Sequence, residues 1–470
     1  MRRTFTLSVA VALAVLLVSG VWGSAAREAE GATDKPNIVF ILADDMRKDD
    51  LKYMPKTRSV LGNKGMSFSN AFVSNALCCP TRSTIMRGQY SHNTGVWTNK
   101  GSNGGVRAYR NEGHEKDNMA TRLDAAGYRT GLFGKYLNEY SGTKDKPRGW
   151  DRWFAHTGGA HYYDYEINDD GRIIHYGSTS ADYETDVIAD HAKTFIGASA
   201  KAGEPFFAYV APRAPHSPAT PATRDKHAHD GLKARRLPSF NEKKVSDKPP
   251  WIRKLPRLSD AKIANIDNRA EKRAETLQAL DDLVAGIVGR LADRGVLSKT
   301  YIFFTSDNGW HAGEHRIPQE KWRPYEEDVH MPLLARGPGV AAGSTTYKLV
   351  LDTDYLPTFT DLADVHTPNY VDGRSLQPVL ERDSTAWRSA ILLEAAAKYS
   401  PAYRGIRTSD GRKYVEYASR KRELYNLGRD PYELRDSYDP KSPPATLAKR
   451  LKKLRSCAAT SCLAAENGES

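Results

Sequence analysis

Short apolar runs alternate with helical stretches along most of this chain, and this alternation limits the folds that it can adopt. Asn37–Leu42 (NIVFIL), Phe206–Val210 (FFAYV) and Tyr301–Thr305 (YIFFT) are almost wholly apolar, as expected of parallel strands covered on both faces. A helix is expected over Ala274–Arg290. The sequence therefore predicts an α/β fold with a large mixed, mostly parallel sheet between layers of helices. Further elements are expected over Met119–Ala126 (helix), Thr130–Phe133 and Pro332–Ala335 (strands).

The pattern changes after residue 371. Strands are expected over Ala390–Leu393, Tyr403–Thr408 and Lys413–Tyr417, the last two joined by a Ser-Asp-Gly turn, and a basic helix is expected over Ala445–Lys453. We therefore expect a large α/β domain over residues 35–371 and a smaller C-terminal α+β domain with an antiparallel sheet over 372–470.

The first 26 residues have the features of an export signal. Arg2 and Arg3 precede the apolar run Leu7–Val18, and small residues suited to cleavage follow at Ser24–Ala26. This run is shorter than the roughly 20 residues that span a bilayer, and no other segment of the sequence is long and apolar enough to be a transmembrane helix. We expect a signal peptide over residues 1–26, a secreted or extracytoplasmic protein, and no stable membrane insertion.

The four cysteines fall into two pairs. Cys457 and Cys462 are five residues apart, and in an exported protein we expect them to form a small disulfide loop. Cys78 and Cys79 are adjacent, and a bridge between neighbouring residues would be strained. The second pair therefore needs another explanation.

Chemically active side chains follow four of the predicted strands, where ligands bind in open α/β sheets. They are Asp44 and Asp45, Lys135, His216, and Asp307 with Asn308. Singly, each is more often a turn, a cap or a surface residue, but together they indicate a site. Three carboxylates and an amide oxygen suit Ca²⁺ or Mg²⁺, and we favour Ca²⁺ because its coordination is looser. His311 and His315 are four residues apart, as zinc ligands on one face of a helix would be, but Gly309 and Gly313 argue against a helix there. We therefore do not expect a zinc site.

Cys78 stands at the start of a predicted helix. Pro80 suits the first helical turn, where a missing N–H costs nothing, and the free amides of that turn attract anions. Arg82, one turn on, can point back toward the same anion. The alternative is an ordinary buried thiol at a helix start.

The run Cys78-x-Pro80-Thr81-Arg82 resembles the modification signature of the formylglycine-dependent sulfatases. The order of the other parts, from Asp44-Asp45 through Gly134-Lys135, His216 and Asp307-Asn308 to Lys321, is similar to that family's order of active-site residues. The resemblance covers about residues 36–440 and includes Glu423–Leu427 with Asp430-Pro431 in the C-terminal part. It implies an alkaline-phosphatase-like fold.

The resemblance also implies a mechanism. A formylglycine-generating enzyme of the export pathway would oxidise Cys78 to an aldehyde, whose hydrate attacks the sulfur of a sulfate ester. The second hydroxyl of the hydrate then expels sulfate, which a thiol or a serine could not do. Asp44, Asp45, Asp307, Asn308 and the modified Cys78 would hold the cation. Arg82 would steady the hydrate, Lys135 and Lys321 would neutralise the transferring group, and His216 would contact the sulfate and the leaving oxygen.

The chain departs from the commoner family pattern at one point. Many relatives carry Gly-Lys-x-His, whereas here Gly134-Lys135-Tyr136-Leu137 has leucine at the histidine position. The longer run GKYLNEY resembles the N-acetylglucosamine-6-sulfatase and extracellular heparan endosulfatase branch. His311 is our candidate for a substrate-binding residue that supplies part of the missing function.

The charge of the chain favours anionic partners. The net charge is +12, and residues 224–257 alone carry 11 Lys or Arg against 4 Asp or Glu, as a solvated loop or an anion-steering rim. No nucleic-acid recognition motif accompanies it. The leading hypothesis is a secreted, Ca²⁺-dependent sulfatase acting on a sulfated sugar or an aryl sulfate. The alternatives are a phosphonate monoester or phosphodiester hydrolase and a catalytically inactive glycan-binding protein.

Overall fold

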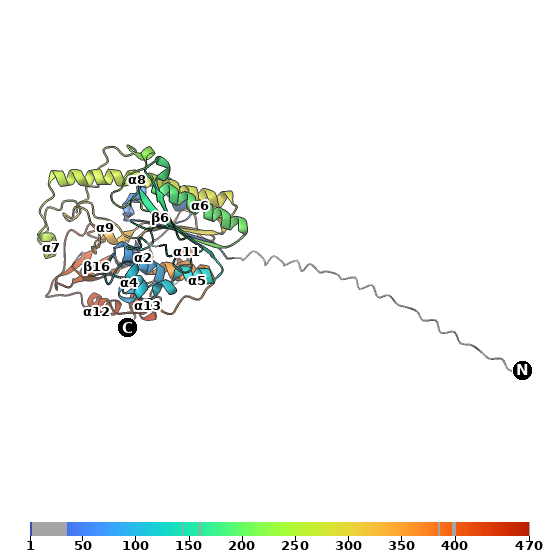
Figure 1. Ribbon diagram of the computed structural model, residues 1–470. Helices are drawn as coiled ribbons and strands as arrows, with labels where there is room; N and C mark the ends of the chain where they lie inside the picture. Colours follow the sequence, from blue (N-terminus) through green and yellow to red (C-terminus); the bar gives the residue numbers. More distant parts are fainter. Residues whose placement is uncertain (2–34, 143, 159–160, 384–385, 397–400, 470) are drawn as a thin grey trace. The chain divides into compact units, whose positions relative to one another are not determined.

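A ten-stranded sheet forms the centre of the fold (Figure 1). The computed structural model describes residues 1, 35–142, 144–158, 161–383, 386–396 and 401–469, so the expected export signal lies outside the described residues. The strand order is β12-β2-β11-β9-β1-β8-β4-β5-β6-β7. The strands are β1 Asn37–Ala43, β2 Met66–Phe68, β4 Arg129–Gly134, β5 Arg152–His156, β6 Tyr165–Asp169, β7 Arg172–Tyr176, β8 Phe206–Ala211, β9 Thr300–Ser306, β11 Leu333–Arg336 and β12 Ser344–Thr346.

Five neighbouring strands of this sheet are parallel. β1 pairs with β8 and β9, and β4 pairs with β8 and β5, all in the parallel sense. The outer strands β11, β6 and β7 pair antiparallel to their inner neighbours. The register sets Ala43 beside Ser306 and Gly134 beside both Ala211 and Ala155, so the five carboxyl ends meet at one edge.

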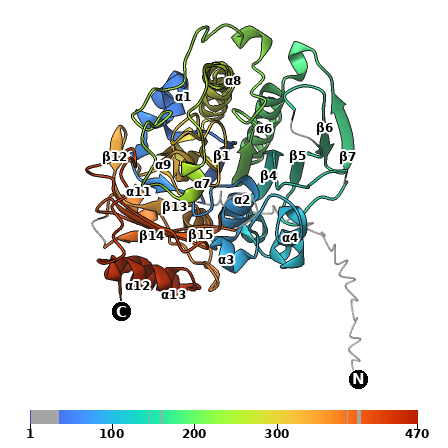
Figure 2. The ribbon, with the colours of Figure 1, turned by 90° about the vertical axis from the view of Figure 1, so that its left-hand side faces the viewer.

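Helices cover both faces of the sheet (Figures 1 and 2). α6 and α8 pack on one face against Val39 and Ile41, while α2, α5 and α10 pack on the other against Phe40 and Leu42. Alternate residues of β1 thus enter two different cores, which explains its continuous apolar run. The helices are α1 Pro55–Thr57, α2 Cys78–Arg87, α3 Ser91–Thr94, α4 Gly105–Asn111, α5 Met119–Ala125, α6 Glu184–Ala202, α7 Pro250–Arg253, α8 Asp260–Asp293, α9 Glu326–Val329, α10 Tyr355–Leu362, α11 Gln377–Leu380, α12 Ala445–Leu454 and α13 Thr460–Asn467.

The C-terminal part carries a second, antiparallel sheet. Its order is β14-β15-β16-β17, over Ala390–Ala395, Tyr403–Thr408, Arg412–Tyr417 and Arg422–Asn426. Leu447, Leu451 and Leu454 of α12 share a core with this sheet. A small sheet, β10-β3-β13 (His330–Met331, Ala71–Phe72, Val350–Leu351), contributes residues to the same core. The predicted fold class, a mixed, mostly parallel sheet between helices with a C-terminal antiparallel sheet, is confirmed.

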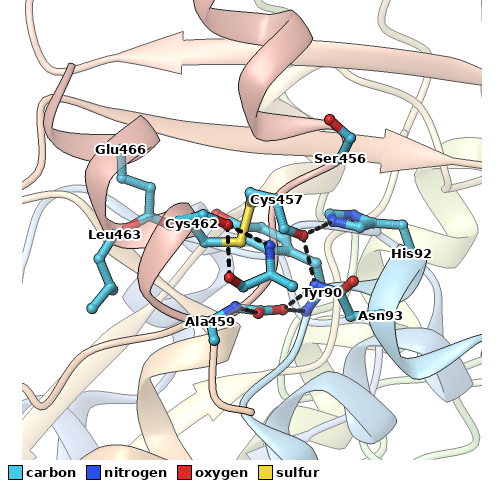
Figure 3. Close-up of a disulfide and its surroundings, with 12 residues drawn as sticks. Tyr90, His92, Asn93, Ser456, Cys457, Ala459, Cys462, Leu463 and Glu466 are labelled. Carbon is cyan, nitrogen blue, oxygen red and sulfur yellow. Dashed lines mark hydrogen bonds between the residues drawn. A yellow bond between two sulfur atoms is a disulfide. The ribbon is translucent and has the colours of Figure 1, made fainter. Parts of the chain in front are cut away.

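A disulfide joins Cys457, in the turn after α12, to Cys462 in the first turn of α13 (Figure 3). His92 Nε2 and Asn93 Nδ2, both on α3, each lie 2.9 Å from the carbonyl oxygen of Cys457. The Asp372 carboxylate accepts from Asn93 Nδ2 and from the backbone N–H of Ala459. The disulfide loop is therefore hydrogen-bonded to the segment that follows α2.

Two regions differ from the sequence-based expectations. α8 begins at Asp260 and not at Ala274, and the Ser259 side chain accepts a hydrogen bond from Lys262 N at its start. The prediction began too late because the exposed first half of the helix lacks the apolar spacing that marks the second half. No strand was predicted between residues 138 and 180, but the structure has β5, β6 and β7 there. β7 is largely exposed, so its sequence carries little of the apolar signal of a strand. Among the described residues, no helix combines the length and apolarity needed to cross a bilayer.

Candidate active site

The carboxyl edge of the parallel strands gathers a buried cluster of charged side chains. Asp44 and Asp45 follow β1, Lys135 follows β4, and Asp307 and Asn308 follow β9. The backbone N–H of Asp44 donates to Ala214 O (3.2 Å), and that of Asp307 donates to Ala43 O (3.1 Å). These bonds tie the three segments after β1, β8 and β9 to one another. The structure thus brings together the predicted residues Asp44, Asp45, Cys78, Arg82, Lys135, His216, Asp307, Asn308 and Lys321.

Two of the acids and the amide contact one another directly. Asp307 Oδ1 accepts from the backbone N–H of Asp45 (3.0 Å), and Asn308 Nδ2 donates to Asp45 Oδ1 (2.7 Å). Asp45 has φ +65°, a left-handed conformation that is uncommon for a residue other than glycine. Backbone strain of this kind is found where a site fixes the direction of a side chain.

Cys78 is the first residue of α2 and faces this cluster. Its Sγ lies 3.7 Å from Asp44 Oδ1, 3.9 Å from Asp45 Oδ1 and 2.8 Å from Lys321 Nζ. Burial raises the pKa of the Cys78 thiol, with Lys135 and Lys321 opposing the shift. The unmodified side chain is therefore a neutral thiol near pH 7, a poor nucleophile.

Three cations surround the acids. Lys135 Nζ lies 2.6 Å from Asp44 Oδ2, and Lys321 Nζ pairs with Asp45 Oδ1. Arg82 Nε donates to Asp307 Oδ2 (2.8 Å) and its Nη1 to Lys135 O (2.8 Å). Burial opposes the ionisation of Asp44, but Lys135, ahead of His216 and Arg82, holds the pKa of Asp44 well below its usual value. Burial and the neighbouring Asp44 raise the pKa of Asp307.

His216 reaches the cluster from the segment after β8. Its Nε2 lies 3.6 Å from Asp45 Oδ2, while its Nδ1 lies 2.6 Å from Ser217 O and 2.7 Å from Arg213 Nη2. Burial lowers the pKa of His216 to about 4, against the opposite effect of Asp44 and Asp45. Nδ1 is thus held by the protein, and Nε2 is the ring nitrogen that faces the acids.

The acidic cluster offers more oxygen atoms than its protein partners use. Asp45 Oδ2 and Asn308 Oδ1 are buried and have no hydrogen-bond partner among the described residues. Asp44, Asp45, Cys78 and His216 each present one ligand atom within 4.8 Å of the others. Unpaired buried oxygens are costly, and hard oxygen ligands are those that Ca²⁺ and Mg²⁺ take. The residues present therefore fit a divalent cation.

His311 lies in a different environment from the one we expected. It is wholly buried, its Nδ1 lies 2.7 Å from Asp328 Oδ1, and its ring packs near those of His315 and Tyr325. His315 Nδ1 in turn lies 2.8 Å from Glu242 Oε2. The contacts of His311 thus join it to α9 and not to the cluster around Cys78, and neither histidine lies in a helix.

Arg273, a buried residue of α8, stabilises the site but was not among the residues predicted from the sequence. Its Nη2 donates to Asp45 O (2.7 Å) and Asp50 Oδ2 (2.8 Å), and its Nη1 donates to Pro215 O (3.2 Å). It therefore links the segment that carries Asp45 to the segment that carries His216. No motif marks Arg273 in the sequence, since a basic residue on a long helix is usually exposed.

A pocket of about 420 Å³ opens beside the cluster. Lys135 and His216 lie on its wall, so the pocket is continuous with the charged site. Its lining is mainly polar and aromatic and includes Asn99, Lys100, Tyr136, Asn138, His156 and Arg213. A pocket of this size with convergent polar groups can hold one small ligand.

The fold is alkaline-phosphatase-like, with the charged cluster at the carboxyl edge of its parallel strands. The family model described as Sulfatase matches residues 36–365, and the model for the N-sulphoglucosamine sulphohydrolase C-terminal region matches residues 313–459. The chain belongs to the sulfatase family and is a sulfuric ester hydrolase. The predicted family is therefore confirmed.

Curated relatives carry related names. N-acetylglucosamine-6-sulfatase of Homo sapiens is 36% identical over 389 residues, covering 80% of this chain and 69% of that protein. The extracellular sulfatase SULF-1 homolog of Drosophila melanogaster is 34% identical over 387 residues, but this chain spans only 34% of that longer protein. An arylsulfatase of Volvox carteri is 30% identical over 484 residues, covering 89% of this chain and 74% of that protein.

Solved structures share the fold. BT4656 in complex with its substrate D-glucosamine-2-N,6-O-disulfate superposes with a TM-score of 0.73 at 24% identity, covering 93% of this chain and 100% of that chain. The phosphonate monoester hydrolase of Agrobacterium radiobacter gives a TM-score of 0.69 at 20% identity, covering 90% of this chain and 95% of that one. The architecture is therefore shared by enzymes that act on sulfate and on phosphonate esters.

Proposed function

We propose that this protein hydrolyses the sulfate ester of a sulfated sugar, with a divalent cation and a formylglycine derived from Cys78. The observation that carries the proposal is the pair of unpartnered buried oxygens, Asp45 Oδ2 and Asn308 Oδ1, in the cluster that Cys78 Sγ faces. In this arrangement Sγ stands in for the oxygen that a converted residue would present. The sugar substrate is supported by the relatives named N-acetylglucosamine-6-sulfatase.

The cation and the converted side chain supply the chemistry that a thiol lacks: polarisation of a sulfate oxygen and an oxygen nucleophile. Asp44, Asp45, Asp307 and Asn308 would hold the cation, which we take to be Ca²⁺, with Mg²⁺ as the alternative. Because all four follow the ends of β1 and β9, the sheet fixes their separation before any ion binds.

The remaining residues handle charge and protons. Lys321 Nζ, 2.8 Å from Cys78 Sγ, and Lys135 Nζ, 2.6 Å from Asp44 Oδ2, place two positive charges where negative charge develops on the transferring group. Arg82, with Nη2 buried and unpartnered among the described residues, fixes Asp307 and keeps one donor free for the group at position 78. His216 is held at Nδ1, which leaves Nε2 to exchange a proton with the leaving oxygen.

The domain assignment and the cellular location are part of the same proposal. All of the proposed catalytic residues lie between positions 44 and 321, within the large domain that we assign to residues 35–371, with 372–470 as the smaller domain. Secretion after removal of residues 1–26 is supported by relatives named as extracellular sulfatases. A formylglycine-generating enzyme would be the maturation partner.

The cation-dependent part of the proposal is tested by titrating chelated protein with Ca²⁺ and with Mg²⁺ in a calorimeter. We expect one Ca²⁺ site, and we expect Asp45→Asn to weaken it by at least about tenfold. Asp230→Asn is the matched control, because Asp230 is an exposed carboxylate outside the cluster around Cys78. Equal Ca²⁺ affinity in the parent and Asp45→Asn proteins would contradict the proposal.

The phosphonate monoester hydrolase likeness sets a second test. An aryl sulfate and the corresponding aryl phosphonate monoester are offered to the same preparation at equal concentration. We expect the kcat/KM for the sulfate to exceed that for the phosphonate. The reverse order would favour a phosphonate hydrolase, and an inactive glycan-binding protein would turn over neither ester.

A further inference from the structure

The pocket beside the catalytic cluster contains a histidine that the sequence did not indicate. His156 is the last residue of β5 and lines the pocket together with Lys135 and His216. The family motif would place a second histidine two residues after Lys135, where this chain has Leu137. The structure thus presents a histidine from a different strand at the same site.

The strand register explains how His156 reaches the pocket. β5 runs parallel to β4, and Gly134 pairs with Ala155. The next residues on the two strands are Lys135 and His156, so both emerge at the same carboxyl edge of the sheet. On the other side of β4, Gly134 pairs with Ala211 of β8, two residues before Arg213.

A wholly buried carboxylate holds the ring of His156. Glu184, the first residue of α6, accepts from His156 Nε2 (2.9 Å) and from the backbone N–H of Arg213 (3.0 Å), both through Oε1. Arg213 Nη2 in turn lies 2.7 Å from His216 Nδ1. Contacts through Glu184 and Arg213 therefore connect the two histidines, and a carboxylate of this kind fixes the orientation and the tautomer of an imidazole.

The pocket has hydrogen-bonding capacity that the protein leaves unused. His156 Nδ1, Asn138 Oδ1 and Arg213 Nε are buried without a hydrogen-bond partner among the described residues. The His156 side chain nonetheless retains 10% exposure. Buried polar atoms without partners are costly, and three in residues that line one pocket suit a ligand rich in hydroxyl groups.

We propose that His156 is a second histidine of the active site, which contacts the hydroxyl-bearing alcohol part of a sulfated sugar, with Glu184 as its positioning residue. This inference rests on the proposed function, because it concerns the alcohol side of the same ester. His156 distinguishes a sugar from a flat aryl group, because an aryl leaving group has no hydroxyl group that could hydrogen-bond to the imidazole ring of His156. His311, bound to Asp328, does not line this pocket.

The test compares two esters in three variants. The kcat/KM values for N-acetylglucosamine 6-sulfate and for 4-nitrophenyl sulfate are measured in His156→Gln, Glu184→Gln and the control His175→Gln, an exposed histidine of β7. We expect His156→Gln to lower the sugar-to-aryl ratio by about 10- to 100-fold, the size of one or two lost hydrogen bonds. Glu184→Gln should lower the same ratio less, and His175→Gln should leave it unchanged.

A binding measurement separates this inference from the proposed function. Calorimetry with N-acetylglucosamine 6-sulfate is run on Cys78→Ala and on Cys78→Ala/His156→Gln, neither of which can form the nucleophile. We expect the second protein to bind at least about tenfold more weakly. If the parent enzyme turns over neither ester, the proposed function fails, and this binding comparison still decides the role of His156. A parallel loss of both activities in His156→Gln, with equal sugar affinity in the two Cys78 variants, would overturn the inference.

Discussion

Two buried lysines, one in each sheet region, have different surroundings, and we propose a catalytic role for one and a structural role for the other. Lys413 on β16 is wholly buried, and its Nζ contacts Pro324 O (2.8 Å), Glu326 Oε1 (3.0 Å) and Glu433 Oε1 (2.7 Å). One backbone carbonyl and two carboxylates thus surround its ammonium group. Lys321 is almost as buried, yet its Nζ meets one carboxylate oxygen and the sulfur of Cys78.

The difference lies in what each cluster leaves open. The Lys413 cluster joins α9 to the antiparallel sheet, and both of its carboxylates, Glu326 and Glu433, lie against a cation. Around Lys321, Asp45 Oδ2 and Asn308 Oδ1 have no partner among the described residues. Buried charge by itself therefore does not indicate a catalytic site, and it is the pair of oxygens without a partner beside Lys321 that favours the catalytic role we propose there.

Removing the side chain at position 78 gives the largest expected effect. Cys78→Ala should lower kcat for aryl sulfates by at least about 10⁴-fold, because the nucleophile is lost. Its melting temperature should change little, since the substitution leaves both acid clusters intact. Residual activity above a hundredth of the parent value would show that another group attacks the ester.

Lys413→Met tests the structural side of the comparison. Removing one member of a buried ion cluster should cost about 3–5 kcal/mol in the free energy of unfolding, because Glu326 and Glu433 lose their cation. Urea unfolding followed by circular dichroism measures this. The kcat/KM of the folded protein should stay within about twofold of the parent, and a large loss of activity at full folding would remove the distinction between the clusters.

Lys321→Met tests the catalytic side. We expect kcat/KM to fall by about 10²- to 10³-fold, the usual effect of removing one charge-stabilising donor. The variant should still unfold in one cooperative transition. Lys262→Met, at an exposed position of α8, serves as the matched control. Parent-like activity in Lys321→Met would place the catalytic charge elsewhere.

The His311–Asp328 pair gives a smaller, pH-dependent effect. Burial opposes protonation, but Asp328 and then Glu327 and Glu314 raise the pKa of His311 to about 9. The charged pair therefore stabilises the fold fully below pH about 6.5, and this contribution is lost as the pH rises through about 9. Burial also raises the pKa of Glu327 to about 8, which lowers stability over pH about 4.5–8.

Replacing His311 should therefore flatten the decline of stability between pH 6.5 and 9. Urea midpoints of the parent and His311→Gln proteins at pH 6, 7.5 and 9 measure this change. The expected difference between the two proteins shrinks with pH and is up to about 3 kcal/mol at pH 6. A constant difference across these pH values would contradict the assigned ion pair.

The disulfide loop gives the smallest expected effect. Replacing Cys457 and Cys462 together by serine opens a short loop, which should lower the free energy of unfolding by about 2 kcal/mol. The catalytic cluster lies in the other region, so aryl sulfate turnover should be unchanged. Loss of turnover at full folding would show that α3, hydrogen-bonded to Cys457 O, transmits the change to the active site.

Much of the site could be predicted from the sequence because parallel strands end at one edge. Asp44, Asp45, Asp307 and Asn308 each follow a strongly apolar strand, so their proximity follows from the sheet alone. Lys321 follows no strand, and only the family resemblance placed it. His156 was missed because no strand was predicted at β5. Without that strand, the register that sets His156 beside Lys135 could not be inferred.

The central claim, that position 78 carries an aldehyde in the active protein, is tested most directly by the mass of the peptide that contains it. The protein is expressed with a formylglycine-generating enzyme, digested without reducing agents that react with aldehydes, and compared with Cys78→Ala. The account predicts a peptide in which CHO replaces CH₂SH, in a proportion that rises with specific activity across preparations. Full sulfatase activity in a preparation whose peptide retains an intact Cys78 thiol would contradict it.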